Sequence, residues 1–90
     1  MISIDDKTTI INFMKSAEEV DLPTTTEEKR KKLKKSFTGR IIVVKDTLND
    51  LEIGRMRPNG DYIYILERNG EEKKLHYSNL EHLYAIPKRT

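Results

Sequence analysis

Two Asn-Gly pairs, Asn59-Gly60 and Asn69-Gly70, constrain the fold of this 90-residue chain more than any other sequence feature. Each pair lies between apolar, alternating segments. Asn-Gly in that setting is the strongest short-range sign of a β-hairpin, because both residues tolerate a positive φ. We therefore expect residues 51–83 to form three consecutive antiparallel strands followed by one helical turn.

The first pair predicts a two-residue turn that places Arg57 opposite Tyr62 and Met56 opposite Ile63. Directly opposed residues lie on the same face of a sheet. One face of this hairpin is therefore cationic and aromatic, and the other is apolar and faces the core.

The second hairpin requires a choice of register. A two-residue turn would place Lys74 opposite the core residue Ile65, whereas a three-residue loop with Gly70 as a bulge places Leu75 opposite Ile63. A slip of one residue moves every side chain to the other face, so the apolar pattern selects the bulged loop.

The polar sides of these three strands then form one surface, here called the tyrosine face, which consists of Arg55, Arg57, Tyr62, Tyr64, Lys74 and His76. Aromatic rings stack on bases and neighbouring cations hold the phosphate backbone, as on many β-sheets that bind single strands. An equally weighted alternative is that an N-terminal helix covers this face and that the tyrosines only pack beneath it.

Two helices are predicted before the strands. Residues 5–20 carry an apolar stripe of Ile10, Phe13, Met14 and Ala17 at helical spacing, which packs on the strands or, alternatively, docks on a partner. Residues 26–36 form a short second helix that begins with a capping box of Thr25 and Glu28.

The β-branched run Ile41–Val44 predicts a strand over residues 37–45, and residues 78–83 and 84–86 predict a helical turn and a short last strand. Residues 37–86 in this order resemble the SH3-like class that includes Tudor and KOW modules. The resemblance rests on Thr38-Gly39-Arg40-Ile41-Ile42, Tyr62-Ile63-Tyr64-Ile65-Leu66 and His76-Tyr77-Ser78-Asn79-Leu80-Glu81-His82-Leu83.

The resemblance implies a small binding module, because such domains bind RNA, DNA or protein and are rarely enzymes. The expected fold is α+β, with one or two N-terminal helices packed on a five-stranded SH3-like antiparallel β-barrel. We expect a helical extension at residues 1–36 and the barrel module at residues 37–90.

Charge is distributed unevenly: residues 1–28 carry a net charge of −5 and residues 29–90 carry +7. Residues 29–44 contain seven basic side chains and no acidic one, here called the basic segment: Lys29, Arg30, Lys31, Lys32, Lys34, Lys35 and Arg40. Such a run neutralises phosphates and releases counterions. The alternatives are a solvated helix face and, with less weight, a nuclear localisation signal.

Catalytic and metal chemistry find little support. The chain has no cysteine, His76 and His82 lack a third ligand, and the four glycines are isolated. Ser78 is expected to cap the helical turn rather than act as a nucleophile. We expect no enzyme activity, no cofactor and no metal.

The sequence contains no run of about 20 apolar residues and no secretory leader, which favours a cytoplasmic protein. The predicted function is non-catalytic nucleic-acid binding, with RNA ahead of DNA, through the basic segment and the tyrosine face. The alternative is a small protein-interaction module, such as a viral or regulatory inhibitor that docks on a host protein through its acidic N-terminal segment. The oligomeric state stays open.

Overall fold

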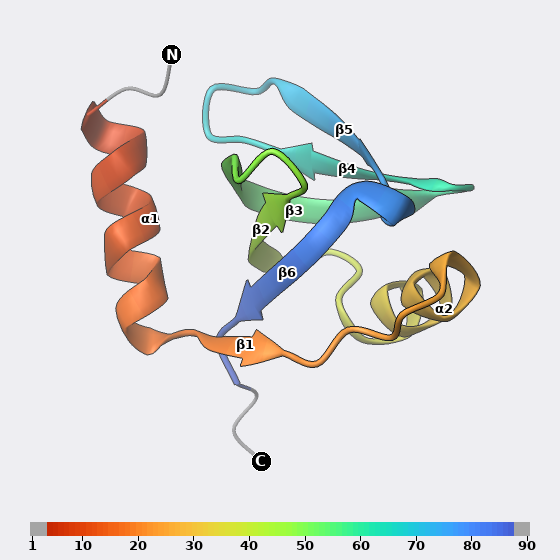
Figure 1. Cartoon of the computed structure of the whole chain (residues 1–90). Coiled ribbons are helices and arrows are strands. Elements are labelled where there is room, and N and C mark those ends of the chain that lie inside the picture. Colours follow the sequence, from red (N-terminus) through yellow and green to blue (C-terminus); the bar gives the residue numbers. More distant parts are fainter. Residues whose placement is uncertain (1–3, 88–90) are drawn as a thin grey trace.

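A computed structural model describes residues 4–87 and the side chains of residues 7–87 (Figure 1). The described part holds two α-helices, six β-strands and one 3-10 turn. In chain order these are α1 (Ile4–Ser16), β1 (Glu18–Val20), α2 (Thr26–Ser36), β2 (Ile41–Asp46), β3 (Leu51–Asn59), β4 (Tyr62–Leu66), β5 (Glu72–His76), η1 (Tyr77–Asn79) and β6 (Leu80–Ala85).

The strands form one antiparallel sheet in the order β1-β6-β2-β3-β4-β5. This arrangement confirms the α+β class. The sheet has six strands and is open, so the predicted closed, five-stranded barrel is not confirmed.

The additional strand comes from residues that the sequence analysis placed in the first helix. That helix ends at Ser16, and Glu18 and Val20 then pair with Ala85 and Leu83 of β6. Because Val20 packs against the core as part of a strand, the extended conformation replaces the last turn of the predicted helix. The proposed division at residue 36 stays a prediction, although β1 belongs to the same sheet as the later strands.

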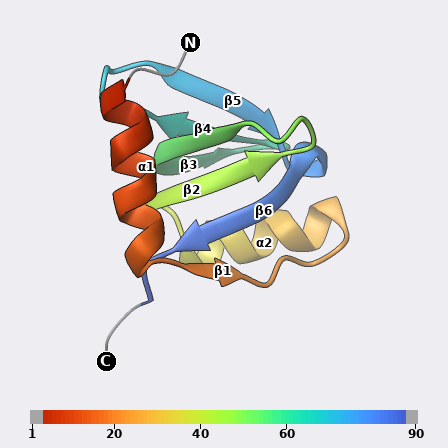
Figure 2. The same cartoon turned by 60° about the vertical axis from the view of Figure 1, so that its left-hand side comes forward.

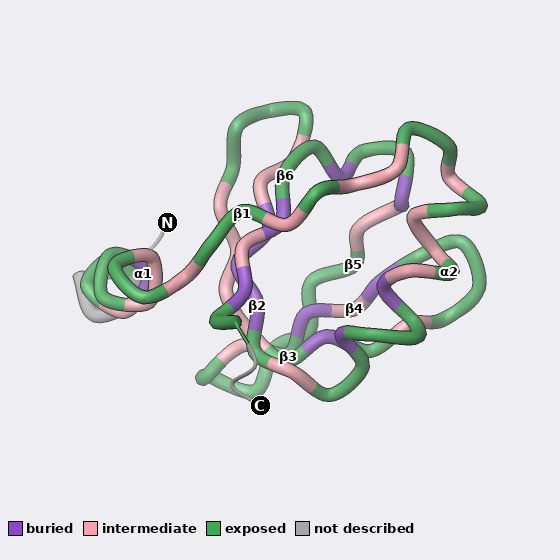
Figure 3. Tube along the Cα trace, turned by 90° about the horizontal axis from the view of Figure 1, so that it is seen from below, coloured by how far each residue is buried: buried purple, intermediate pink, exposed green. Residues whose placement is uncertain are grey.

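The sheet bends around the hydrophobic core (Figure 3), and α2 lies against its inner side. Leu33 and Phe37 join the core there, together with inward side chains of the strands: Ile42, Val44, Met56, Ile63, Ile65, Leu80, Leu83 and Ala85. The predicted span of α2 is confirmed, and Thr25 caps it, since its Oγ1 accepts a hydrogen bond from the Glu28 backbone N–H at 3.2 Å. Burial of Leu33 anchors this otherwise charged helix.

The helix α1 lies on the opposite, outer side of the sheet, against β2 (Figure 2). Ile10 of α1 and Val43 on the outer side of β2 are both buried, and neither belongs to the main core. The apolar stripe of α1 therefore packs on the sheet. The helix does not cover the tyrosine face. Tyr62 is 37% exposed, and its strand β4 is two strands away in the sheet from β2, on which α1 packs.

The second hairpin has the predicted register, with Ile63 opposite Leu75 and Gly70 at a φ of +89°. The first hairpin differs from the prediction by two residues, since Arg57 lies opposite Tyr64 rather than Tyr62. Gly60 has a φ of +62° whereas Asn59 has no positive φ, so the turn follows the pattern with glycine at its first central position. A shift of two residues preserves the faces of the strands, so the tyrosine face forms as predicted.

A helical turn follows β5 as predicted, but it does not extend over residues 78–83. The turn is the shorter η1, and Leu80 already begins β6. Both Leu80 and Leu83 are fully buried, but they reach the core from a strand. His76 rather than Ser78 caps η1, because the His76 ring accepts the Ser78 backbone N–H.

Candidate nucleic-acid interface

The tyrosine face lies on the outer side of β3, β4 and β5, directly opposite the core. Tyr62 and Tyr64 alternate along β4 with the fully buried Ile63 and Ile65, and this alternation directs both phenol rings outward. Pairing across the sheet then places Arg57 and Lys74 on either side of Tyr64.

Each tyrosine ring is in contact with a cation. The guanidinium carbon of Arg57 lies 4.5 Å from the centre of the Tyr64 ring, and Lys74 Nζ lies 4.1 Å from the centre of the Tyr62 ring. The edge of His76 also meets Tyr62 in a T-shaped contact, with ring centres 5.0 Å apart. The face therefore combines flat aromatic surface with positive charge at distances typical of cation–π contacts.

An acidic residue that the sequence analysis did not assign to this face also lies on it. Glu72 Oε2 is 3.2 Å from Arg57 Nη2, and both side chains are partly exposed. The predicted register of the second hairpin already implies this position, because Glu72 lies two residues before Lys74 on β5 and therefore on the same face of the sheet. An exposed pair of this kind contributes only about 0–1 kcal/mol, so a phosphate can replace the carboxylate at low cost.

Two other members of the tyrosine face have structural contacts. Arg55 Nη1 donates to the Gly39 carbonyl oxygen at 3.0 Å. His76 Nδ1 accepts the Ser78 N–H at 3.0 Å and lies 2.7 Å from Ser78 Oγ. The His76 ring therefore holds the turn at the end of β5, and the Ser78 contact belongs to that turn.

The basic segment divides into side chains that hold backbone carbonyls and side chains that face solvent. Lys29 Nζ donates to the Leu80 carbonyl oxygen at 3.0 Å, and Arg40 Nη2 donates to the Ile86 carbonyl oxygen at 2.6 Å. Lys32 also donates to a backbone carbonyl, that of Asp21. These three cations connect α2 and the following loop to other parts of the chain, so the structure does not bring them together with the tyrosine face.

The other cations of the segment face solvent. Arg30 and Lys31 form weak pairs with Asp61 and Glu27, both at 3.5 Å. Lys34 and Lys35 are exposed on the last turn of α2.

A depression of about 360 Å³ separates α2 from the β3–β4 turn, and it is lined by Arg30, Lys31, Lys34, Pro58 and Gly60. The turn that borders this depression also joins the two strands that carry Arg57 and Tyr62. The outward cations of α2 are thus placed beside the β3–β4 turn, on the side of the sheet where Pro58 lies opposite the core residue Ile63.

A carboxyl pair lies on the other side of the β3–β4 hairpin. Burial, then a side-chain hydrogen bond to Glu67, and then the negative charge of Glu67 raise the pKa of Glu52 from 4.5 to about 7. Lys73 lowers it and Asp50 adds to the increase. The pair borders the core and not the tyrosine face, so we assign it an effect on stability.

Among the described side chains of residues 7–87, no group of three or more histidine or acidic residues is placed to hold a metal ion. None of the helices in this part is long and apolar enough to cross a membrane. Comparison with protein-family models, with curated proteins and with solved structures gives no match, so a function has to be inferred from the chain's own residues.

Proposed function

We propose that this protein is a non-catalytic nucleic-acid-binding module whose contact surface is the tyrosine face together with the outward cations of α2. RNA is the first ligand to test, ahead of DNA. The cysteine-free sequence is consistent with action in the cytoplasm. The resemblance of the strand order to SH3-like binding modules supports a binding role but does not identify the ligand.

One observation carries the proposal: two outward tyrosines and two cations alternate on a surface that α1 leaves uncovered. Lys74 lies 4.1 Å from the centre of the Tyr62 ring, and Arg57 lies 4.5 Å from the centre of the Tyr64 ring. Stacking on aromatic rings supplies affinity without sequence preference, and the cations supply the phosphate contacts. The cations of the depression beside α2 add positive charge at the turn that joins the two strands of this face.

The alternative of a protein-interaction module has less support. Its docking element would be the apolar stripe of α1, and Ile10 of that stripe is buried against the sheet. Among residues 7–16, whose side chains the structure describes, Ile11 is the only large, exposed hydrophobic side chain of that helix.

The sharpest test uses the ion pair between Arg57 and Glu72. Glu72→Gln frees Arg57 for phosphate, so binding of a labelled single-stranded RNA should strengthen about two- to fivefold, which corresponds to the energy of an exposed pair. The matched control, Glu71→Gln, removes the same charge from the neighbouring, exposed position. Equal effects of the two substitutions, or no binding by the wild type at low salt, would contradict the proposal.

A second experiment separates phosphate contacts from stacking. The variant replaces Lys31, Lys34 and Lys35 with glutamine. Lys29 and Lys32 stay unchanged, because they donate to backbone carbonyls and their loss would perturb the fold. This triple variant should flatten the dependence of log K on log salt by about 0.7 per lost single-strand contact. Tyr64→Ala should weaken binding by about 1–3 kcal/mol and leave the salt slope unchanged.

A further inference from the structure

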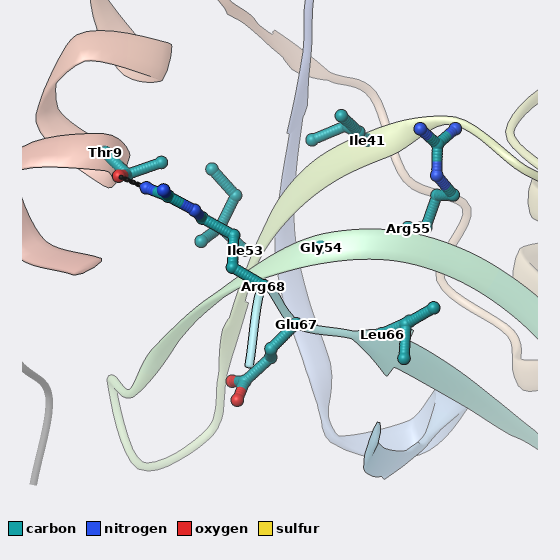
Figure 4. Close-up of a pocket in the computed structure, with 8 residues that line it drawn as sticks. All are labelled: Thr9, Ile41, Ile53, Gly54, Arg55, Leu66, Glu67 and Arg68. Carbon is teal, nitrogen blue, oxygen red and sulfur yellow. Dashed lines mark hydrogen bonds between the residues drawn. The ribbon is translucent and has the colours of Figure 1, made fainter. Parts of the chain in front are cut away.

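A groove opens at the other end of the tyrosine face, between α1 and the strands (Figure 4). Its apolar floor consists of Ile41 of β2, Ile53 of β3 and Leu66 of β4, and its volume is about 280 Å³. Ile41 and Leu66 are 46% and 42% exposed, which is high for large apolar side chains. The backbone of Gly54 completes the lining between Ile53 and Arg55.

Two arginines border this floor. Arg68 Nη1 donates to Thr9 Oγ1 at 3.1 Å, and Arg55 donates to the Gly39 carbonyl oxygen. A guanidinium has five N–H donors, so each arginine keeps donors for an anion while it holds its present contact. Glu67 contributes to the lining, but its carboxylate points away from both arginines in Figure 4. The groove thus combines an apolar floor with positive charge at its borders.

The strand pairing makes the groove continuous with the tyrosine face. Along β4, Tyr62, Tyr64 and Leu66 are the three successive outward positions, and their partners on β3 are Asn59, Arg57 and Arg55. Ile41 of β2 continues the last row, because it lies opposite Arg55. The outer side of the hairpin therefore presents three rows, of which the first two are centred on tyrosines and the third is the groove.

The spacing of these rows selects among nucleic-acid forms. Alternate residues of a strand are about 7 Å apart, whereas nucleotides in one strand of a duplex advance about 3.4 Å each. A ligand that places one base in each row must have its bases unstacked, as in an extended single strand.

We propose that the groove is the third base site of a single strand that lies along β3 and β4, with its first two bases on Tyr62 and Tyr64. The base contacts Ile41, Ile53 and Leu66, and Arg55 and Arg68 bind the flanking phosphates. This inference rests on the proposed function and adds to it a ligand form, an extended single strand, and a minimum length of three nucleotides.

Oligouridylates of two, three and four nucleotides test the inference by NMR titration of the full chain. The wild type should bind the trinucleotide about tenfold more tightly than the dinucleotide, since each added base contact is worth about that factor. The fourth nucleotide should add much less. Leu66→Ser and Arg68→Gln should each reduce the gain at the third nucleotide and leave dinucleotide binding unchanged.

Matched controls exist for both substitutions. Leu48→Ser makes the same change at a leucine that is 78% exposed in the loop between β2 and β3, and Lys15→Gln removes a cation from the last turn of α1. Both controls should keep the tenfold gain. Far-ultraviolet circular dichroism verifies that every variant is folded, which is expected because Leu66 and Arg68 are outside the core.

The outcomes separate this inference from the proposed function. If the wild type binds and Tyr64→Ala weakens binding, but the third nucleotide adds nothing or Leu66→Ser keeps the gain, the groove is not a base site. Equal affinity per nucleotide for a longer, stable RNA duplex would also overturn the inference. If no oligonucleotide binds the wild type at low salt, the proposed function itself is wrong.

Discussion

Replacing Glu52 with glutamine is expected to remove a pH dependence of folding stability between about pH 4.5 and 7. Burial and the adjacent Glu67 raise the pKa of Glu52 in the folded chain from 4.5 to about 7, with Asp50 and Lys73 as the other charged neighbours. Between these values the folded chain retains a proton that the unfolded chain releases. Stability from this group is therefore complete below pH 4.5 and is lost as the pH rises through 7.

The magnitude follows from the size of the shift. If the whole pKa difference of Glu52 contributed to folding stability, at 1.36 kcal/mol per pKa unit, the contribution would be about 3 kcal/mol. Glu52 is only half-buried and solvent screens its interactions, so we expect about 1–2 kcal/mol.

Urea denaturation at pH 5, 6, 7 and 8 measures the effect, followed by circular dichroism because the chain has no tryptophan. The stability of Glu52→Gln relative to the wild type should increase by about 1–2 kcal/mol from pH 5 to pH 8. Glu71→Gln, at an exposed position of the neighbouring loop, serves as the control for a general charge effect. A parallel pH profile for the wild type and Glu52→Gln would refute the reasoning.

Three further substitutions test the packing, each by urea denaturation. Gly54→Ala would place a Cβ 2.3 Å from the Leu66 carbonyl oxygen, so it should destabilise the fold by about 3 kcal/mol or more; a wild-type midpoint would contradict this. Gly70→Ala meets no atom within 4 Å but requires a φ of +89°, so its cost should be only about 1 kcal/mol, and a larger cost than that of Gly54→Ala would be inconsistent. The buried Tyr77 hydroxyl has no hydrogen-bond partner among the described residues, so Tyr77→Phe should stabilise the fold by about 1 kcal/mol, and a loss of stability would reveal an unrecognised partner.

The two hairpins show how far the sequence could predict the sheet. In the second hairpin the competing registers differed by one residue, and only one of them kept Ile63 and Leu75 on the core side. In the first hairpin the correct register differed from the predicted one by two residues. Such a shift leaves every side chain on the same face, so the apolar pattern cannot detect it.

Short elements were less predictable. The strand β1 has three residues and forms only because β6 offers an edge more than 60 positions further along the chain. No local pattern in Glu18-Glu19-Val20 distinguishes a strand from the end of a helix. The local sequence pattern could not predict that the sheet is open either, because closure of a sheet depends on contacts between distant strands.

The candidate site was partly predictable. Strand alternation was sufficient to place the tyrosine face outward, but it could not show that Glu72 pairs with Arg57. The sequence did contain evidence that Lys29 differs from the solvent-facing cations of the basic segment. Lys29 lies four residues before the apolar Leu33 and therefore on the inward side of α2. The groove requires Ile41 and Leu66 from separate strands, so it becomes visible only with the sheet order.

The most direct test of the central claim is a 15N NMR titration of the full chain with a short single-stranded RNA at low salt. The account predicts that amide shifts concentrate on β3–β5, with Arg57, Tyr62 and Tyr64 among the most affected, and that α1 residues such as Phe13 stay unchanged. Absence of any shift, or shifts confined to α1, would contradict the claim that the tyrosine face binds nucleic acid.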